Sequence, residues 1–485
     1  MKKSPSIFLL CYLLCAPFVF AGNDVSFRKE EKRSSSLSQK ESEMRIADSP
    51  AVMIDPVFTQ VKKVQATNGA DYDIFGFSVS ISGDGDTVVV GAREGDGRFA
   101  DTGAVYIFDR NYPTTDAWGQ RPKIFADDGE AGDGFGCSVS ISGDGDTVVV
   151  GAREGYGKDS NSGSAYIFDR NYPTTNAWGQ RKRIFHEDVD GKEEDDQFGI
   201  SVSISKNTVV VGAYFDDDKG TSSGSAYIFD RDQDGANNWG QVQKIVAEDG
   251  AAFDNFGASV SISENTVLVG AFSDYHHSSP KAGSAYIFDR NPSTNVWGQV
   301  KKIIASDYAT SDQFGFSVSI SGDGDTAVVG AFYGNGNVAN TGSVYIFDRN
   351  YPTTNAWGQS KKIIDDSENG EIGEMFGISV SISGDRLVVG ADFDNDNGSA
   401  YIFDRNYPTT NAWGVRPNMP ITAYDGAAFD RFGHSVSISG DTVVVGAYGD
   451  DDKGDESGSA YVYKEYVPNN ELKAMPGIPL LLLDD

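Results

Sequence analysis

The sequence predicts an all-β fold made of seven similar four-stranded antiparallel units, and three observations support this prediction. A Phe-Gly pair recurs about every 60 residues, which is typical of a structural repeat. Each copy holds four short runs rich in Val, Ile, Tyr and Phe, separated by Gly, Asp, Asn and Pro, as in strands joined by turns. No stretch shows the apolar period of about 3.6 residues that an amphipathic helix would give. The pairs begin at Phe75, Phe135, Phe198, Phe256, Phe314, Phe376 and Phe432.

The first run of each copy reads FGxSVSIS. Because side chains alternate along a strand, we expect Phe75, Phe77 and Val79 to share one face. Ser78 and Ser80 then take the other face, and such small side chains suit an innermost strand, where sheets converge on an axis. The second run, TVVVGA, is apolar on both faces, as expected in a sheet packed between two neighbours. The third and fourth runs read GSAYIFDR and WGQxKKI.

The copies follow one another without polar linkers, which favours a seven-bladed β-propeller over separate domains or a solenoid. The seventh copy ends at Tyr463 without a WGQxKKI run, whereas residues 58–64, before the first copy, read FTQVKKV. We therefore expect this N-terminal strand to complete the last blade and close the ring, which hides sheet edges. The same register predicts a structural role at the start of each outer strand for Phe58 and the six tryptophans. These are Trp118, Trp178, Trp239, Trp297, Trp357 and Trp413.

The ends of the chain differ from the repeats. Residues 1–21 read as a secretory signal, because two lysines precede an apolar run that ends in Val-Phe-Ala. This run is shorter than the roughly 20 residues of a membrane-spanning helix, so we expect a secreted or extracellular protein with no transmembrane segment after signal removal. Residues 22–49 are predicted to be a disordered leader, 50–466 the propeller and 467–485 a C-terminal tail.

Signal removal would leave Cys137 as the remaining cysteine, which excludes an internal disulfide and predicts a small core residue. The net charge of -31 and pI near 4.4 argue against nucleic-acid binding, which needs a basic surface. The same charge disfavours anionic membranes and permits an extracellular protein or glycan as the partner.

The pattern FG, then VVGA, then GSAYIF resembles FG-GAP repeats, the units of the integrin alpha-subunit propeller and of many secreted bacterial and algal proteins. The resemblance covers about residues 57 to 463 and implies a seven-bladed propeller with extracellular binding or adhesive roles. Two features depart from that family. The proline of the GAP motif is missing, as in Gly91-Ala92-Arg93, and a short turn such as Ser205-Lys206-Asn207 replaces the DxDxDG-like calcium loop between the first two strands.

Strand alternation places the loops that enter each first strand on the same face as the loops between second and third strands. On this face Asp392, Asp394 and Asp396 stand at alternate positions before Asn397-Gly398, which predicts a calcium site. Asp216, Asp218, Asp450 and Asp452 are the second choice for a metal, because adjacent carboxylates are expected to repel without converging. A solvated acidic turn is the alternative for all these loops. Asn397 also begins an Asn-x-Ser sequon, so a glycan is expected there in a eukaryote.

A carboxylate precedes every Phe-Gly pair by two residues, which favours a turn-capping role in the fold over ion binding. These carboxylates are Asp73, Asp133, Asp196, Asp254, Asp312, Glu374 and Asp430. Repeat-specific residues are better candidates for a unique function. They are Arg93, Arg153, Met375 and the run Tyr275-His276-His277.

The sequence holds no nucleophile elbow, zinc-protease or paired-cysteine motif, and we expect no enzyme. The predicted function is a secreted binding or adhesion propeller that contacts its ligand through the acidic loops. An acidic structural protein of a cell wall or mineral surface is the alternative. A propeller hydrolase with paired carboxylates is the third hypothesis.

Overall fold

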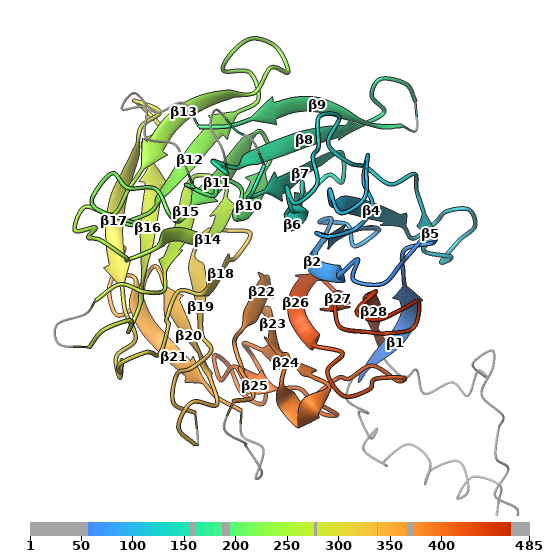
Figure 1. Cartoon of the computed structure of the whole chain (residues 1–485). Coiled ribbons are helices and arrows are strands. Elements are labelled where there is room, and N and C mark those ends of the chain that lie inside the picture. Colours follow the sequence, from blue (N-terminus) through green and yellow to red (C-terminus); the bar gives the residue numbers. More distant parts are fainter. Residues whose placement is uncertain are drawn as a thin grey trace, which may run out of the picture. The chain divides into compact units, whose positions relative to one another are not determined.

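The computed structural model describes residues 57–155, 157, 161–175, 177–186, 195–275, 279–336, 338–365 and 373–466. These residues form seven four-stranded antiparallel sheets, as predicted (Figure 1). The one helical element among them is a short 3-10 turn, η1 (Asp394–Asp396). The predicted signal (1–21), leader (22–49) and tail (467–485) lie outside the described residues.

The strands fall into four classes by their place in each sheet. The innermost strands of blades 1 to 7 are β2 (Phe75–Ile81), β6 (Phe135–Ile141), β10 (Ser201–Ser205), β14 (Phe256–Ser263), β18 (Ser317–Ile320), β22 (Ser379–Ser383) and β26 (Phe432–Ser439). The second strands are β3 (Thr87–Ala92), β7 (Thr147–Ala152), β11 (Thr208–Ala213), β15 (Thr266–Ala271), β19 (Thr326–Ala331), β23 (Arg386–Ala391) and β27 (Thr442–Ala447). The third strands are β4 (Ala104–Asp109), β8 (Ser164–Arg170), β12 (Ser225–Asp230), β16 (Ser284–Arg290), β20 (Ser343–Asp348), β24 (Ser399–Asp404) and β28 (Ser459–Tyr466). The outer strands are β5 (Gly119–Gln120), β9 (Trp178–Ile184), β13 (Gly240–Ile245), β17 (Trp297–Ile303), β21 (Gly358–Ile363), β25 (Gly414–Val415) and, in blade 7, β1 (Val57–Val64).

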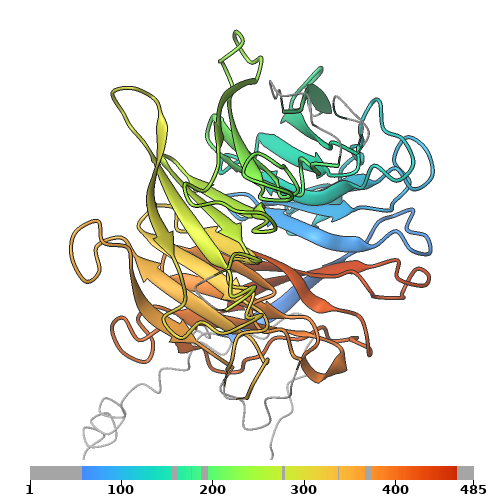
Figure 2. The same ribbon diagram turned by 60° about the vertical axis from the view of Figure 1, so that its left-hand side comes forward.

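The sheets close into a ring around a common axis. Each innermost strand contacts the innermost strands of both neighbouring blades, and β26 lies beside β2 (Figure 1). The outer strand of blade 7 is β1, which pairs antiparallel with β28 from Val57–Tyr466 to Val64–Ala460. Figure 2 shows the red strands of the last blade beside the blue strands of the first. Ring closure by the N-terminal strand is therefore confirmed.

Serine hydroxyls join the innermost strands to one another. The Ser78 Oγ donates to the Gly136 carbonyl of the next blade at 2.8 Å, and each blade repeats this bond. The other six pairs are Ser138–Gly199, Ser201–Gly257, Ser259–Gly315, Ser317–Gly377, Ser379–Gly433 and Ser435–Gly76. The approach also requires the glycine of VVGA, because a Cβ on Gly91 would lie 2.1 Å from the Gly136 carbonyl oxygen. Serine and glycine thus permit the close contact around the axis.

The innermost strand is less regular than simple alternation predicts. Phe75 and Val79 are buried in the core between blades, whereas Phe77 is half-buried and its ring lies 5.0 Å from that of His434 in blade 7. The register of β2 on β3 shifts between Phe75 and Ser78, and Gly76 has a φ of 92°. This bulge interrupts the alternation. Phe77 instead lies under the Arg93 guanidinium, 4.6 Å from its carbon to the ring centroid.

The tryptophans pack in the cores between blades, as predicted. Trp297 is 2% exposed and Trp239 is 1% exposed, whereas Trp178 is half-buried. A guanidinium at or just after the end of the third strand covers the ring in several blades, such as Arg349 at 4.7 Å from the Trp357 centroid. These contacts support a structural role for the tryptophans.

The arginines at the ends of the third strands of blades 2 to 6 also tie each of these blades to the one before it. Arg349 Nη1 lies 2.7 Å from Asp289, and Arg349 Nη2 donates to Thr266 Oγ1 at 2.6 Å. Equivalent bonds to the preceding aspartate join Arg170 to Asp109, Arg231 to Asp169, Arg290 to Asp230 and Arg405 to Asp348. The Asp-Arg pair of GSAYIFDR is therefore used in contacts between blades.

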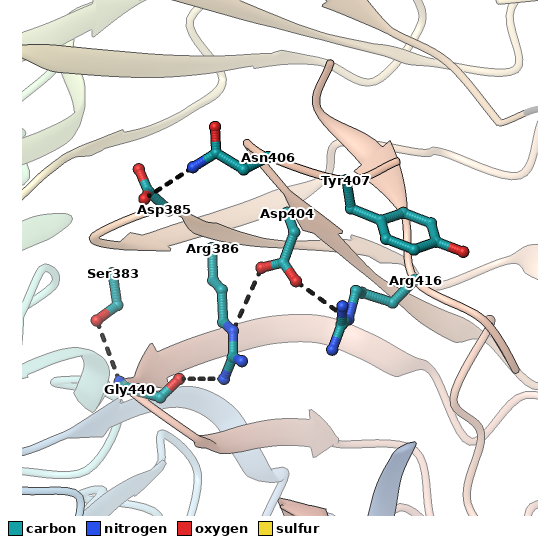
Figure 3. Close-up of a pocket in the computed structure, with 8 residues that line it drawn as sticks. All are labelled: Ser383, Asp385, Arg386, Asp404, Asn406, Tyr407, Arg416 and Gly440. Carbon is teal, nitrogen blue, oxygen red and sulfur yellow. Dashed lines mark hydrogen bonds and ion pairs between the residues drawn. The ribbon is translucent and has the colours of Figure 1, made fainter. Parts of the chain in front are cut away.

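Blades 6 and 7 make this contact differently. A cavity of about 400 Å³ lies beside Arg386, Asp404 and Arg416, drawn in Figure 3. Asp404 accepts from Arg386 at 3.3 Å and lies 3.1 Å from Arg416. Arg386 also donates to the Gly440 carbonyl of blade 7 at 3.2 Å. The polar groups that line this cavity hold the two blades together.

Candidate functional site

The loops entering the innermost strands and the loops between second and third strands lie on one face, as predicted. At the end of the latter loops, Gly103 forms a parallel bridge with Phe135 at the start of the next blade. The same bridge recurs as Gly163–Phe198, Gly224–Phe256, Gly283–Phe314, Gly342–Phe376, Gly398–Phe432 and Gly458–Phe75. We call the surface formed by these two sets of loops the loop face.

The carboxylates that precede the Phe-Gly pairs cap turns on the loop face. Asp254 is 2% exposed and its Oδ2 accepts the Ala251 amide at 2.7 Å. Four more make the same bond three residues back: Asp73 to Ala70, Asp133 to Glu130, Asp312 to Ala309 and Asp430 to Ala427. The predicted fold role is confirmed for these five. Burial raises the pKa of Asp254, Asp312 and Asp430 to about 6.

Lysine ammonium groups bind other carboxylates of the loop face. In blade 4 the Lys302 Nζ lies 2.7 Å from Asp249 and 2.6 Å from Asp274. The Tyr286 hydroxyl donates to the same two carboxylates at 3.1 and 2.9 Å, and Lys302 lies 5.2 Å from the Tyr286 ring centroid. Burial alone would lower the pKa of Lys302, but the hydrogen bonds to Asp249 and Asp274 outweigh it and raise the pKa.

The second-choice metal residues belong to the same arrangement. Asp216 and Asp218 both contact Lys244, at 2.8 and 2.7 Å. Asp450 and Asp452 both contact Lys63, at 2.8 and 2.6 Å. The expectation that these carboxylates do not converge is wrong, because a lysine of the outer strand stands between them. Sequence reasoning missed it because spacing within the loop does not show which outer-strand side chain reaches it, and Lys63 is 387 residues from Asp450.

The first-choice calcium residues have separate partners. Asp392 Oδ2 lies 2.9 Å from His434 Nδ1, whereas Asp394 Oδ2 accepts the Tyr401 hydroxyl at 2.8 Å. Asp396 is exposed. Within the described ranges no group of three or more His, Cys, Asp or Glu is placed to hold a metal ion. Calcium binding at Asp392, Asp394 and Asp396 stays a prediction.

Asn397 is half-buried, with its side-chain nitrogen beside Gly426. Its glycosylation also stays a prediction. Tyr275 is 59% exposed on the loop face, while His276 and His277 lie outside the described residues. Arg93 and Arg153 each pair with the following glutamate, at 3.4 and 3.2 Å. Arg93 and Arg153 therefore have partners within their own loops, whereas Tyr275 is exposed.

The loop face also holds seven exposed aromatic side chains, including the six most exposed of the described residues, and sequence reasoning singled out only Tyr275 among them. They are Tyr72 (57%), Phe99 (60%), Phe253 (60%), Tyr275 (59%), Phe393 (37%), Tyr424 (78%) and Phe429 (65%). On the opposite face Tyr112 and Tyr351 are 37% and 49% exposed. Rings that contribute little to the core gather at one end of the blades.

Three of these aromatic residues have an unfavourable backbone conformation. Tyr72, Phe253 and Phe429 directly precede a turn-capping carboxylate and have φ values of 66°, 70° and 74°. A bulky side chain rarely adopts this left-handed region, which costs about 1 kcal/mol or more. At this place the other repeats carry Gly132, Asp195, Ser311 and Gly373. The sequence could have pointed to these three exposed rings, because they are aromatic residues at a position where the other copies have glycine, serine or aspartate.

A hydrogen bond to the preceding blade fixes each of these loop tips. The Phe429 amide donates to the Asp396 carbonyl at 2.7 Å, and the Phe253 amide donates to the Thr221 carbonyl at 2.7 Å. The Tyr72 amide donates to Asp455 in the same way at 2.6 Å. The backbone therefore holds the three rings out into solvent in a fixed place.

Comparison with known proteins agrees with this architecture. None of the curated proteins searched matches the chain. Within the described residues, no helix is long and apolar enough to cross a membrane. The sequence pattern of the FG-GAP repeat matches at residues 58–108, 118–168, 178–229, 239–288, 297–347, 357–403 and 418–463. The first six matches begin at an outer strand and end in the third strand of the next blade, so the first includes β1, whereas the seventh begins just after β25. The chain therefore belongs to the FG-GAP repeat family, as a seven-bladed β-propeller.

Proposed function

We propose that this chain is a secreted or cell-surface binding propeller, without catalytic activity, that contacts an extracellular partner through its loop face. The observation that carries the proposal is the set of Tyr72, Phe253 and Phe429, exposed rings on left-handed backbone. Such strain persists where the surrounding structure holds it, and it concentrates at functional sites. Glycine in the same place would avoid the strain, so the rings have a use that the fold alone does not supply.

The chemistry of the loop face suits a partner protein with exposed lysine and arginine. Aromatic rings dominate the binding energy of protein interfaces, and their faces attract cations. Asp396 and Asp455 lie at the loop tips beside Phe429 and Tyr72, and the chain carries a net charge of -31. Acidic loops around exposed rings therefore favour basic proteins. A glycan that stacks on the rings is the second candidate for the partner.

The alternative of an acidic structural protein for a wall or mineral surface uses carboxylates and has no need of the rings. A hydrolase needs a carboxylate pair that can act as acid and base. In blades 4 and 7 the carboxylate pairs of the loop face are held by Lys302 and Lys63. These contacts support a binding role over hydrolysis.

The test is a binding screen of extracellular matrix proteins and glycans, with and without EDTA. The variant Tyr72→Ser, Phe253→Ser, Phe429→Ser introduces the residue that Ser311 already provides in blade 5. We expect it to lose at least about tenfold in affinity, since exposed aromatic anchors contribute most of such an interface. The control, Tyr112→Ser with Tyr351→Ser, removes exposed rings from the opposite face and should bind as the intact chain does.

Equal binding by the triple variant would contradict the proposal. Binding that is unchanged in the triple variant but lost in EDTA would instead support the metal-bridged acidic surface. A glycan bound in preference to every basic protein would keep the loop face as the site and change the class of partner.

A further inference from the structure

Three blades hold an arginine side chain in the same way on the face opposite the loop face. In blade 1 the Arg121 Nε lies 2.5 Å from Asp109 Oδ2, and the guanidinium covers the Tyr112 ring at 3.9 Å from its centroid. The equivalent sets are Arg181, Asp169 and Tyr172 in blade 2 and Arg416, Asp404 and Tyr407 in blade 6, the last drawn in Figure 3. A third-strand carboxylate and a tyrosine ring thus form a repeated guanidinium site, which an arginine of the same blade fills.

Blade 5 keeps the carboxylate and the tyrosine of this site and lacks the arginine. Its loop has the same Asn-Tyr-Pro-Thr-Thr sequence as the loops of blades 1, 2 and 6, and its third strand ends at Asp348. Ser360 takes the place of the arginine, because it lies two residues after the glycine that pairs with the third-strand aspartate, as the three arginines do. Blade 5 therefore has Asp348 and Tyr351 without a guanidinium of its own outer strand.

One oxygen of Asp348 is left for a further donor. Asp348 Oδ1 accepts from Thr326 at 3.0 Å and from Arg405 of blade 6 at 3.3 Å, whereas Oδ2 has no partner among the described residues. Blades 3 and 4 also lack the outer arginine, but there the arginine of the next blade lies on Oδ2. These pairs are Arg290–Asp230 and Arg349–Asp289, at 3.0 and 2.7 Å. The Asp348 side chain is 25% exposed, compared with 10% for Asp109, so this oxygen is accessible from solvent.

A cavity of about 670 Å³ between blades 5 and 6 is lined by Asp348, Tyr351 and Ser360. The Tyr351 ring is 49% exposed, whereas Tyr112 beneath its arginine is 37% exposed. Arg405 is the one cationic side chain among the residues that line the cavity. The further carboxylates in its wall are Asp323, Asp325 and Asp385. The cavity is therefore predominantly acidic, and it opens where blades 1, 2 and 6 have their arginine.

We propose that blade 5 binds an arginine side chain of a partner protein, with its guanidinium on Asp348 Oδ2 and over the Tyr351 ring. A guanidinium donates several hydrogen bonds in one plane and stacks on aromatic faces, as the arginines of the three other blades do. Asp325 and Asp385 lie 2.8 and 2.9 Å from Arg349 and Arg405, so Asp348 is the carboxylate that remains for the ligand. This site lies on the face opposite the loop face, so it does not depend on the exposed rings there.

The test is calorimetric titration of the intact chain with millimolar Nα-acetyl-arginine methylamide. We expect one site, with no binding of the matching citrulline compound, which has nearly the same shape without the charge. Asp348→Asn should weaken binding at least about tenfold, because it removes the charged partner of the guanidinium. Ser360→Arg should abolish binding, because it supplies the arginine of the other blades and fills the site. Ser360→Ala is the matched control and should bind as the intact chain does.

Thermal unfolding by circular dichroism identifies any variant that does not fold, and the two ligands on the intact chain decide the case without variants. Equal binding of the arginine and citrulline compounds would overturn the proposal, as would no binding of either. Binding that persists in folded Ser360→Arg would overturn it too, because the guanidinium would then bind elsewhere. The variant with Tyr112→Ser and Tyr351→Ser separates the two faces, since it should lose affinity for the arginine compound and keep the partner of the loop face.

Discussion

The Arg386 guanidinium lies 2.6 Å from the Glu465 carboxylate, across the contact between blades 6 and 7. Register with the other repeats places Arg386 where they have threonine and Glu465 where they have arginine. The usual bond runs from an arginine back to the preceding blade. Here the direction of charge is reversed and the contact is kept, with Arg416 as a further donor to Glu465 at 3.0 Å.

This reversed pair predicts compensation. Glu465→Arg would place a third guanidinium beside Arg386 and Arg416 and should lower the free energy of unfolding by about 2 kcal/mol or more. Adding Arg386→Thr restores the threonine and arginine of the other blades, so the double variant should recover most of the loss. Urea unfolding of the two variants measures this. A double variant no more stable than the single one would show that the repeats are not equivalent here.

The contact between blades 7 and 1 offers a stabilising change. Lys464 stands where other blades have the aspartate that receives an arginine, and Arg110 pairs instead with Asp86 and Asp116 of its own blade. Lys464→Asp should let Arg110 bind across the contact and add about 0.5 to 1 kcal/mol of stability. Lys464→Ala is the control, since it removes the cation without supplying a partner. Differential scanning calorimetry should show a higher Tm for the aspartate variant alone.

The tryptophans allow a matched test of burial. Trp297→Ala should cost about 3 to 5 kcal/mol, because the ring is buried and leaves a cavity. Trp178 takes the same place in blade 2 but is half-buried, so Trp178→Ala should cost clearly less. Denaturant unfolding compares the two. A loss of ligand binding at unchanged stability would contradict the structural role.

The buried turn-capping carboxylates predict a pH dependence. Their folded pKa of about 6 lies above the ordinary 3.8 for Asp254, Asp312 and Asp430, so the folded chain binds protons more tightly than the unfolded chain between these values. Their contribution to stability therefore falls as pH rises from about 4 to about 6, and they lower stability at neutral pH.

Replacing the three by asparagine keeps an oxygen for the amide bond and removes the buried charge. We expect a gain at pH 7.5 on the order of 1 kcal/mol per site and a flatter pH profile between pH 4 and 6. Asp249→Asn is the control, for which we expect the opposite change in stability. Burial acts to raise the pKa of Asp249, but its contacts with Lys302 and Tyr286 outweigh burial and lower the pKa, so that variant should lose stability at neutral pH.

Much of the fold follows from the sequence because every repeat carries the same strands. The unpaired strand at residues 58–64 predicted ring closure, and recurrence of the tryptophans predicted their burial. The bulge at Gly76 did not follow, because it depends on how closely the neighbouring blade approaches. Period-two alternation describes a regular strand and contains no information on the next sheet.

The site followed less well. The loop face was predicted from strand direction alone, but the partners of its carboxylates were not, since Lys63 is 387 residues from Asp450 in the chain. The spacing of Asp216 and Asp218, and of Asp450 and Asp452, suggested metal ligands, but in the structure each pair contacts a lysine ammonium. The exposed rings at Tyr72, Phe253 and Phe429 could have been found by comparing copies, because they occupy a place that other copies give to small or polar residues.

The seven serine hydrogen bonds around the axis restrict changes in the number of repeats. Each bond spans two blades at 2.8 Å, so all of them depend on one angle between neighbours. The near-identical stretches of this sequence invite unequal recombination, which would add or delete a whole repeat. A ring of six or eight blades would alter every angle at once and strain all the bonds together. Close contact at the axis therefore selects against changes in repeat number, while each outer loop stays free to diverge.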